Sequence, residues 1–192
     1  MERLATRVGI GFATGRKSFQ NVLRSYVFHL EESKFPLESG VSLNLFVAFD
    51  PAYSGTKRED YEEIEPRVRR WFDEVFFFSP EDVKREAEKL AGLGIVPAGE
   101  ARLCFGNGYA AQRNIVLYQA LRQKMDYLIF FDDDEYPMAV TNSDTSGVAL
   151  WSGQRVIETH VKYLQFSDVT NGYHCGYLSP LPSLELDGIL DE

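Results

Sequence analysis

The chain has 192 residues, which is the length of one ordinary domain of about 100 to 200 residues. Hydrophobic residues make up 44% of it, and this excludes a chain that is disordered throughout, because such chains lack the apolar residues needed for a core. With 20 Lys and Arg against 29 Asp and Glu, the net charge is −9. The general basic surface of a nucleic-acid-binding protein is therefore absent, and no nucleic-acid partner is expected.

The sequence also bears on where the protein acts. Cys104 and Cys175 form no CxxC pair, so neither a disulfide framework nor a zinc ribbon is indicated. Charges stand near the N-terminus where a secretory signal has its apolar region, and the strongest apolar run, Tyr127 to Phe131, has five residues, against about 18 for a membrane span. These patterns predict a cytoplasmic protein without a transmembrane segment, and they leave a peripheral membrane contact open.

Short apolar runs alternate with stretches of helical period along the chain. This alternation predicts the α/β class with parallel strands. A first strand is expected over 7–12, a turn over 13–17, and a helix capped by Ser18. Six apolar residues at helical spacing form one face of that helix: Phe19, Val22, Leu23, Tyr26, Val27 and Leu30.

The next elements follow the same alternation. A second strand is expected over 41–49 and ends at Asp50, and a charged helix is expected over 60–72. A third strand over 75–78 leads into a helix from Pro80 to about Leu93, for which Ser79 supplies the N-cap and Asp82 the third-position acid. Gly94 is the expected stop of this helix.

A further helix is expected over 109–123, with Ala110, Ile115, Leu117, Tyr118 and Leu121 available for packing. The run 127–131 predicts a central strand, because it is short, unbroken and apolar. After Pro137 the pattern predicts a polar loop to Gly147 and a helix around 154–164.

Four consecutive acids, 132–135, follow the most apolar strand. They repel one another, and burying them is costly unless each is paired. Ligands of open parallel sheets bind outside the carboxyl ends of the strands, and Mg²⁺ or Mn²⁺ sites often use one or two carboxylates together with phosphate oxygens. The position of the run therefore indicates a metal-bound phosphate ligand rather than a solvated acidic turn.

Three other segments are candidates for contacts to such a ligand. GNGYAAQRN, residues 106–114, opens a helix whose free N–H groups favour anions, and Arg113 lies one turn in. In ATGRKS, residues 13–18, backbone N–H groups with Arg16 and Lys17 could meet phosphate, although an ordinary turn accounts for the segment equally well. Asp50 can accept hydrogen bonds from a ribose or a base, or simply begin a turn before Pro51.

Three stretches in this order, VGIGFATGRKSFQNVLRSYVFHL, VSLNLFVAFDPAYSG and GYAAQRNIVLYQALRQKMDYLIFFDDDEYP, resemble the nucleotide-sugar-binding half of GT-A fold glycosyltransferases, especially family 2. The resemblance runs from about Val8 to Pro137 and is most specific over 108–134. It implies a three-layer α/β/α sandwich with a mostly parallel sheet. It also implies one domain over 1–192, in which 1–137 bind the nucleotide sugar and 138–192 form a short acceptor-side segment.

The resemblance further implies roles for individual residues. Asp132 and Asp134 would form the Asp-x-Asp motif that binds Mn²⁺ or Mg²⁺, and Asp133 would lie near the ribose or the cation. The other donor-site residues it implies are Ala13, Thr14, Arg16, Asp50 and Arg113. The expected substrates are a UDP- or GDP-linked sugar and an acceptor hydroxyl of unknown identity.

The C-terminal segment offers the remaining candidates. His174, in a loop rich in Gly and Tyr, is a third metal ligand or a packed turn residue. For the base that takes the acceptor proton, Asp168, Glu185 and Asp187 are all candidates, and we take Asp168 and Asp187 forward. His160 and His29 are expected on helix faces.

Three other functions compete with this one. A phosphatase of the haloacid dehalogenase type is disfavoured, because Tyr136 stands where Thr or Val is needed. A sugar nucleotidyltransferase is disfavoured because ATGRKS is a poor match to its long Gly-rich loop. The short segment after Pro137 makes a non-catalytic nucleotide- or sugar-binding domain the main alternative. A homo-oligomer is left open.

Overall fold

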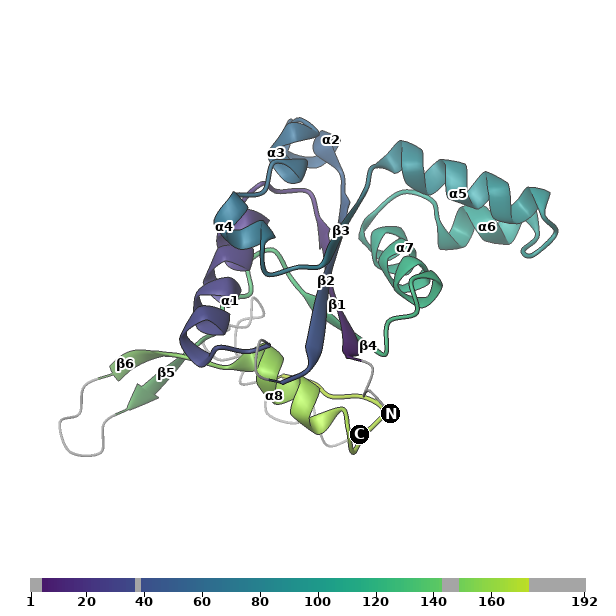
Figure 1. The fold of residues 1–192 in the computed structure, drawn as a ribbon. Coiled ribbons are helices and arrows are strands. Elements are labelled where there is room, and N and C mark those ends of the chain that lie inside the picture. The colour runs from purple at the N-terminus through teal and green to yellow at the C-terminus, as the bar shows by residue number, and fades with distance from the viewer. Residues whose placement is uncertain (1–4, 37–38, 143–148, 173–192) are drawn as a thin grey trace, which may run out of the picture.

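A computed structural model describes residues 5–36, 39–142 and 149–172. Four strands, β1 (Thr6–Thr14), β2 (Val41–Phe49), β3 (Glu74–Phe78) and β4 (Tyr127–Phe131), form a parallel sheet in the order β3-β2-β1-β4 (Figure 1). From their third residues onward, β1 and β2 are buried at every position. The predicted α/β class with parallel strands is confirmed.

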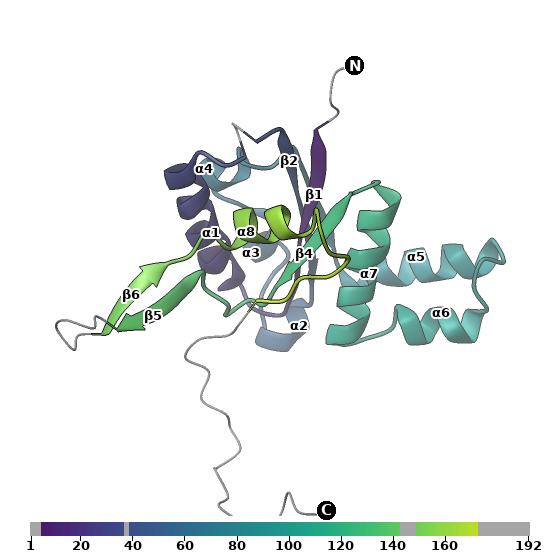
Figure 2. The same ribbon diagram turned by 90° about the horizontal axis from the view of Figure 1, so that it is seen from below.

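Helices cover both faces of this sheet (Figures 1 and 2). The helices of one face are α1 (Phe19–Ser33), α3 (Glu59–Glu62), α4 (Pro66–Arg69) and α8 (Val156–Tyr163), which share a core with Val8, Ile10 and Phe12. On the other face α5 (Pro80–Gly92) and α7 (Tyr109–Arg122) pack on Phe46 and Ala48. The arrangement is compatible with a three-layer sandwich.

Stacked aromatic rings hold the first of these layers together. Tyr26 of α1 stacks on Phe131 of β4 with 4.0 Å between ring centroids, and Tyr61 of α3 stacks on Phe49 of β2 at 4.7 Å. Burial of one such side chain stabilises the fold by roughly 1.5–3 kcal/mol. The predicted apolar face of α1 is buried at all six positions.

Several predicted elements agree with the structure closely. The strands at 41–49 and 127–131 have the predicted bounds. At α5, Ser79 accepts a hydrogen bond from the Asp82 N–H, and the Asp82 carboxylate accepts one from the Ser79 N–H at 3.0 Å, which completes a capping box. Ser18 precedes α1 as predicted but makes no side-chain capping bond.

The helix predicted over 60–72 is wrong as one element. It is divided into α3 and α4, because Pro66 disfavours helical backbone at the residue before it, and Glu65 accordingly has a ψ of 131°. Two short helices were not predicted: α2 (Pro51–Ser54), which follows β2, and α6 (Ala98–Cys104), which packs on α5 and α7.

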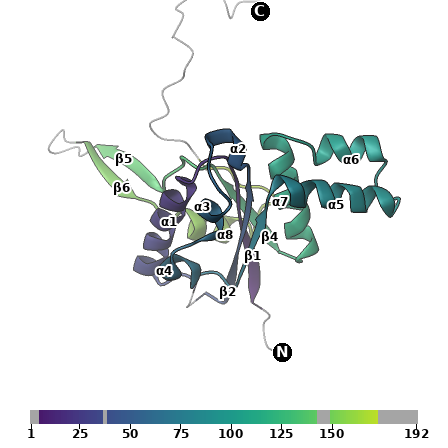
Figure 3. The ribbon, with the colours of Figure 1, turned by 90° about the horizontal axis from the view of Figure 1, so that it is seen from above.

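The polar loop predicted after Pro137 is also wrong. Strands β5 (Met138–Asn142) and β6 (Ala149–Gly153) pair there as an antiparallel two-stranded sheet. This pair and the α5–α6 pair lie on opposite sides of the central sheet (Figure 3).

The packing face predicted for α7 is partly wrong. Ile115 is buried as expected and Tyr118 is half-buried, but Ala110, Leu117 and Leu121 are exposed, and Val116 is buried instead. The reason is a close approach to β1: a Cβ on Gly11 would lie only 2.8 Å from Val116 Cγ1. The absent side chain of Gly11 therefore fixes which face of α7 meets the sheet.

No helix in the described part of the chain combines the length and the apolar character needed to cross a membrane.

Candidate functional site

The candidate site lies where β1 and β4 end side by side. From β1 the chain passes through α1 to β2 on one side, and it returns to β4 through α7 on the opposite face of the sheet. Such a reversal of strand order is where open α/β sheets bind ligands, outside the carboxyl ends of the strands. The acidic run 132–135 follows β4 at this point.

Thr14 connects the two strand ends. Its side chain is 1% exposed, and its hydroxyl donates a hydrogen bond to Asp133 Oδ2 at 2.7 Å while accepting one from the Arg16 N–H at 3.0 Å. Asp133 is largely buried, with 14% of its side chain exposed. A buried carboxylate needs such partners, and Thr14 supplies one from the neighbouring strand.

Arg16 extends over the acidic run from the loop between β1 and α1. Its Nη1 lies 3.3 Å from Asp133 Oδ1 and 3.5 Å from Asp134 Oδ2. The guanidinium also lies 5.8 Å from the ring centroid of Tyr53. Contact with Tyr53, and then the charge of Asp133, raise the pKa of Arg16, so this side chain is a permanent positive charge at the site.

Gly15 determines how closely Tyr53 approaches this loop. A Cβ at Gly15 would lie 2.6 Å from the Tyr53 side chain, a distance that real Cβ atoms do not adopt. The bare backbone at Gly15 thus allows α2, which carries Tyr53, to pack against the end of β1.

Asp132 is held from the other side by the first turns of α7. The Tyr109 hydroxyl donates a hydrogen bond to Asp132 Oδ1, and Arg113 Nη2 lies 3.3 Å from the same oxygen. Burial and this hydrogen bond raise the pKa of Tyr109, so it stays a neutral donor at physiological pH.

Arg113 is fixed between two aromatic rings. Its guanidinium carbon lies 5.2 Å from the Tyr109 ring centroid and 4.9 Å from that of Phe130, which are favourable cation–π distances. Its buried Nε has no hydrogen-bond acceptor among the described residues. Asp132 therefore does not satisfy all of its donors.

Asp50 and Ala13 occupy structural positions at the strand ends. The Asp50 carboxylate caps α2 by accepting a hydrogen bond from the Ala52 N–H at 3.0 Å, and the Asp50 N–H donates to the Thr14 carbonyl at 3.0 Å. Ala13 is 1% exposed within β1. Asp50 thus lies beside Thr14, whereas the Ala13 side chain belongs to the core.

The predicted residues of the C-terminal segment are not brought to this site in the described part of the chain. Asp168 is exposed beyond α8, and its side chain has no hydrogen bond or ion pair in the described ranges. His174, Glu185 and Asp187 lie outside the described residues.

Three carboxylates of the acidic run share two guanidinium groups. Asp133 and Asp134 pair with Arg16, and Asp132 pairs with Arg113, which leaves one negative charge in excess within this set. Over residues 5–36, 39–142 and 149–172, no group of three His, Cys, Asp or Glu side chains is arranged to hold a metal ion. Any cation here would need ligands from its substrate or solvent.

Sequence reasoning missed two residues of the site, Tyr53 and Tyr109. Tyr109 could have been found, because it precedes Arg113 by four residues on one helix and so shares its face. Tyr53 has no comparable signal, since its place depends on how α2 packs on Gly15.

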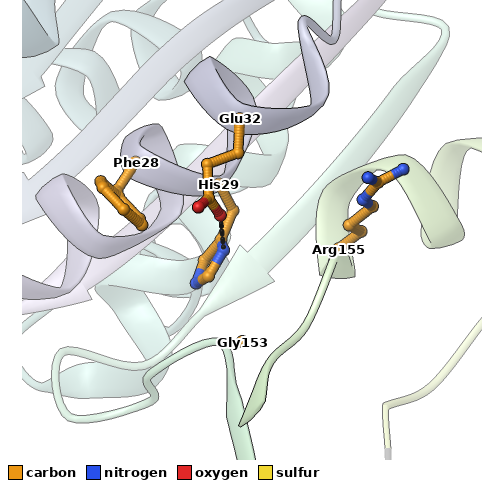
Figure 4. Close-up of a pocket in the computed structure, with 5 residues that line it drawn as sticks. All are labelled: Phe28, His29, Glu32, Gly153 and Arg155. Atoms are coloured by element: carbon orange, nitrogen blue, oxygen red, sulfur yellow. Dashed lines mark ion pairs between the residues drawn. The ribbon is translucent and has the colours of Figure 1, made fainter.

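A separate cavity of about 430 Å³ lies at the far end of α1 (Figure 4). It is lined by Phe28, His29, Glu32, Gly153 and Arg155, and His29 Nδ1 lies 3.3 Å from Glu32 Oε2. A Cβ at Gly153 would overlap the His29 ring. None of the residues predicted to bind the ligand lies in this cavity.

Comparison with family models gives no match to the chain, and comparison with curated proteins gives no significant match.

Proposed function

We propose that the protein is a metal-dependent glycosyltransferase of the GT-A type, which transfers a sugar from a UDP- or GDP-linked donor to an acceptor hydroxyl. The observation that supports this most directly is the position of Asp132, Asp133 and Asp134 at the carboxyl end of β4, between Arg16 and Arg113. Carboxylates flanked by guanidinium groups suit a ligand that carries both phosphate and a divalent cation.

The residues present fit a Mn²⁺ or Mg²⁺ ion. All three Asp side chains offer oxygen ligands, which these cations prefer, and the cations commonly take only one or two carboxylates with phosphate oxygens and water completing the shell. A site without a third protein ligand is therefore expected for a cation that arrives with a diphosphate. Asp134, whose side chain is 74% exposed, is the most accessible direct ligand, and Asp132 is the second.

The protein's own residues then have distinct tasks. Arg113, held near two rings and with 41% of its side chain exposed, would bind the diphosphate or the sugar. Thr14 fixes Asp133, and Asp50, beside Thr14, is placed near the nucleoside. A bound cation would neutralise the diphosphate as the leaving group. A carboxylate from 138–192, with Asp168 and Asp187 as candidates, would accept the proton of the acceptor hydroxyl.

Calorimetric titration tests the donor site directly. UDP, GDP, CMP and their common sugar conjugates are titrated in the presence of Mn²⁺ and again with EDTA. We expect one nucleotide to bind with Mn²⁺ only, and Asp134→Asn to remove the binding. Glu88→Gln, which removes an exposed carboxylate from α5, is the matched control and should bind as the wild type does. If no nucleotide binds, the proposal is wrong.

The main alternative, a nucleotide- or sugar-binding domain without turnover, is favoured by one observation. The described candidate base, Asp168, is exposed, and within the described ranges no hydrogen bond or ion pair holds its side chain in place. Incubation with the donor that binds separates the two functions. A transferase should release nucleotide by slow hydrolysis of the donor, whereas a binding domain should release none. In either case Asp168→Asn should still bind the donor.

A further inference from the structure

Arg16 contacts Asp134, the most accessible carboxylate proposed to bind a divalent cation, and also the neighbouring Asp133. Its Nη1 lies within 3.5 Å of oxygens of both Asp133 and Asp134. A metal ion at these oxygens and a guanidinium group in the same place would repel each other strongly, since like charges at close range are unfavourable. The metal ion and the Arg16 guanidinium therefore cannot both lie at Asp134.

The structure lets the Arg16 side chain leave without disturbing the fold. Its backbone is held, because its N–H donates to the buried Thr14 hydroxyl, whereas 46% of its side chain is exposed. Exposed ion pairs of this kind contribute little to stability. Movement of the guanidinium therefore breaks two ion pairs and one cation–π contact, with Tyr53, while the loop backbone stays in place.

Arg113 differs in this respect. Its guanidinium lies within cation–π distance of two rings, whereas that of Arg16 lies near one more distant ring, Tyr53. Its carboxylate contact is to Asp132 Oδ1, the oxygen that also accepts the Tyr109 hydrogen bond. Displacing it would break two cation–π contacts. Of the two arginines at the site, Arg16 is the one that can be exchanged.

We propose that Arg16 is a built-in counter-cation, which a divalent metal bound at Asp134 displaces and whose released guanidinium then binds the diphosphate. This inference rests on the proposed function and deepens it. When the metal binds alone, the displaced Arg16 guanidinium has no new partner, and the metal therefore binds weakly. Metal and nucleotide together provide that partner, so each raises the affinity for the other, and by thermodynamic linkage the two effects are equal.

The first test measures binding of Mn²⁺ alone to the full chain, from the loss of the free Mn²⁺ signal in electron paramagnetic resonance. Arg16→Gln should bind Mn²⁺ about three- to tenfold more tightly than the wild type, as expected for removal of two weak competing ion pairs. Lys17→Gln removes the same charge one residue away, where the described chain shows no ion pair. It should change Mn²⁺ affinity much less.

The second test measures binding of UDP and GDP with Mn²⁺ present. Arg16→Gln should weaken this binding, because the diphosphate loses the guanidinium that binds it. The variant should therefore have a higher affinity for Mn²⁺ alone and a lower affinity for the nucleotide. Arg16→Lys keeps the charge and should restore part of the wild-type behaviour. Circular dichroism checks that each variant is folded.

The outcomes distinguish this inference from the function on which it rests. If wild type binds Mn²⁺ and nucleotide but Arg16→Gln and Lys17→Gln have the same Mn²⁺ affinity, Arg16 does not compete with the metal and only this inference is overturned. If neither the wild type nor any variant binds Mn²⁺, with or without UDP or GDP, both the inference and the metal-dependent function are overturned.

Discussion

At the scale of single residues, Thr14 determines the geometry of the candidate site. It is the buried hydroxyl that lies between Asp133 on one strand end and the Arg16 N–H on the other. Its position results from β1 continuing to residue 14, beyond the expected end of this strand at residue 12. A site built on a strand end is more rigid than one built on a loop.

Thr14→Val keeps the shape of this side chain and removes its hydroxyl. We expect a loss of about 1–3 kcal/mol in the free energy of unfolding, because a buried carboxylate loses a hydrogen-bond donor. Urea unfolding measures this, with the exposed Thr159→Val as control. An unfolding free energy equal to that of the control would mean that Asp133 does not depend on Thr14.

Residues of the acidic run could be predicted as site residues from the sequence, because four consecutive acids repel one another and a bound cation relieves that repulsion. Their protein partners could not. Thr14 and Asp133 are separated by 119 positions, and Tyr109 and Asp132 by 23, so which donor meets which carboxylate depends on strand order. Arg16 and Arg113 were expected near the ligand for local reasons, a strand-to-helix turn and a helix start, but the carboxylate that each one contacts was not.

At the scale of elements, α7 shows how tertiary contacts select a helix face. Its apolar residues occupy more than one face, so periodicity alone favoured Leu117 and Leu121, which are exposed. Instead, Val116 packs against Gly11 of β1, which has no side chain in the way, and Ile115 beside it is fully buried. The same rotation directs Tyr109 and Arg113 toward Asp132.

From this orientation of α7 we predict different losses of stability when two nearby large residues, Ile115 and Leu117, are replaced by Ala. Ile115→Ala should lower the free energy of unfolding by about 2–5 kcal/mol, because it leaves a cavity under the sheet. Leu117→Ala should change it by about 0.5 kcal/mol or less, as for other surface positions. Urea unfolding of both variants measures the difference, and equal losses would contradict the described helix face.

At the scale of the whole molecule, one carboxylate connects segments that are distant in the sequence. Glu31 of α1 accepts hydrogen bonds from Arg67 Nε at 3.1 Å and Arg70 Nη2 at 3.0 Å, and Trp71 Nε1 lies 3.4 Å away. These hydrogen bonds, above all the one from Arg67, lower the pKa of Glu31 to about 2. Those from Arg70 and Trp71 add to the effect.

The lowered pKa gives the stability of the fold an acid dependence. The contribution of Glu31 is fully present above its ordinary pKa of 4.5 and is lost as the pH falls toward 2. In urea unfolding at neutral pH, Glu31→Gln should be less stable than the wild type. This difference in unfolding free energy should shrink as the pH falls from 4.5 to about 2. Glu88→Gln should show no such change, and a gap for Glu31→Gln that stays constant with pH would contradict the assignment.

The sequence by itself determined the α/β class, the four parallel strands, the buried face of α1 and the acidic run after β4. These follow from local patterns, since apolar period, capping residues and strand-end acids act over a few neighbouring residues. Tertiary structure alone decided the strand order, the rotation of α7 and the partners of each carboxylate. Those features depend on contacts between segments far apart in the chain, where one missing side chain, such as that of Gly11 or Gly15, sets how closely two elements approach.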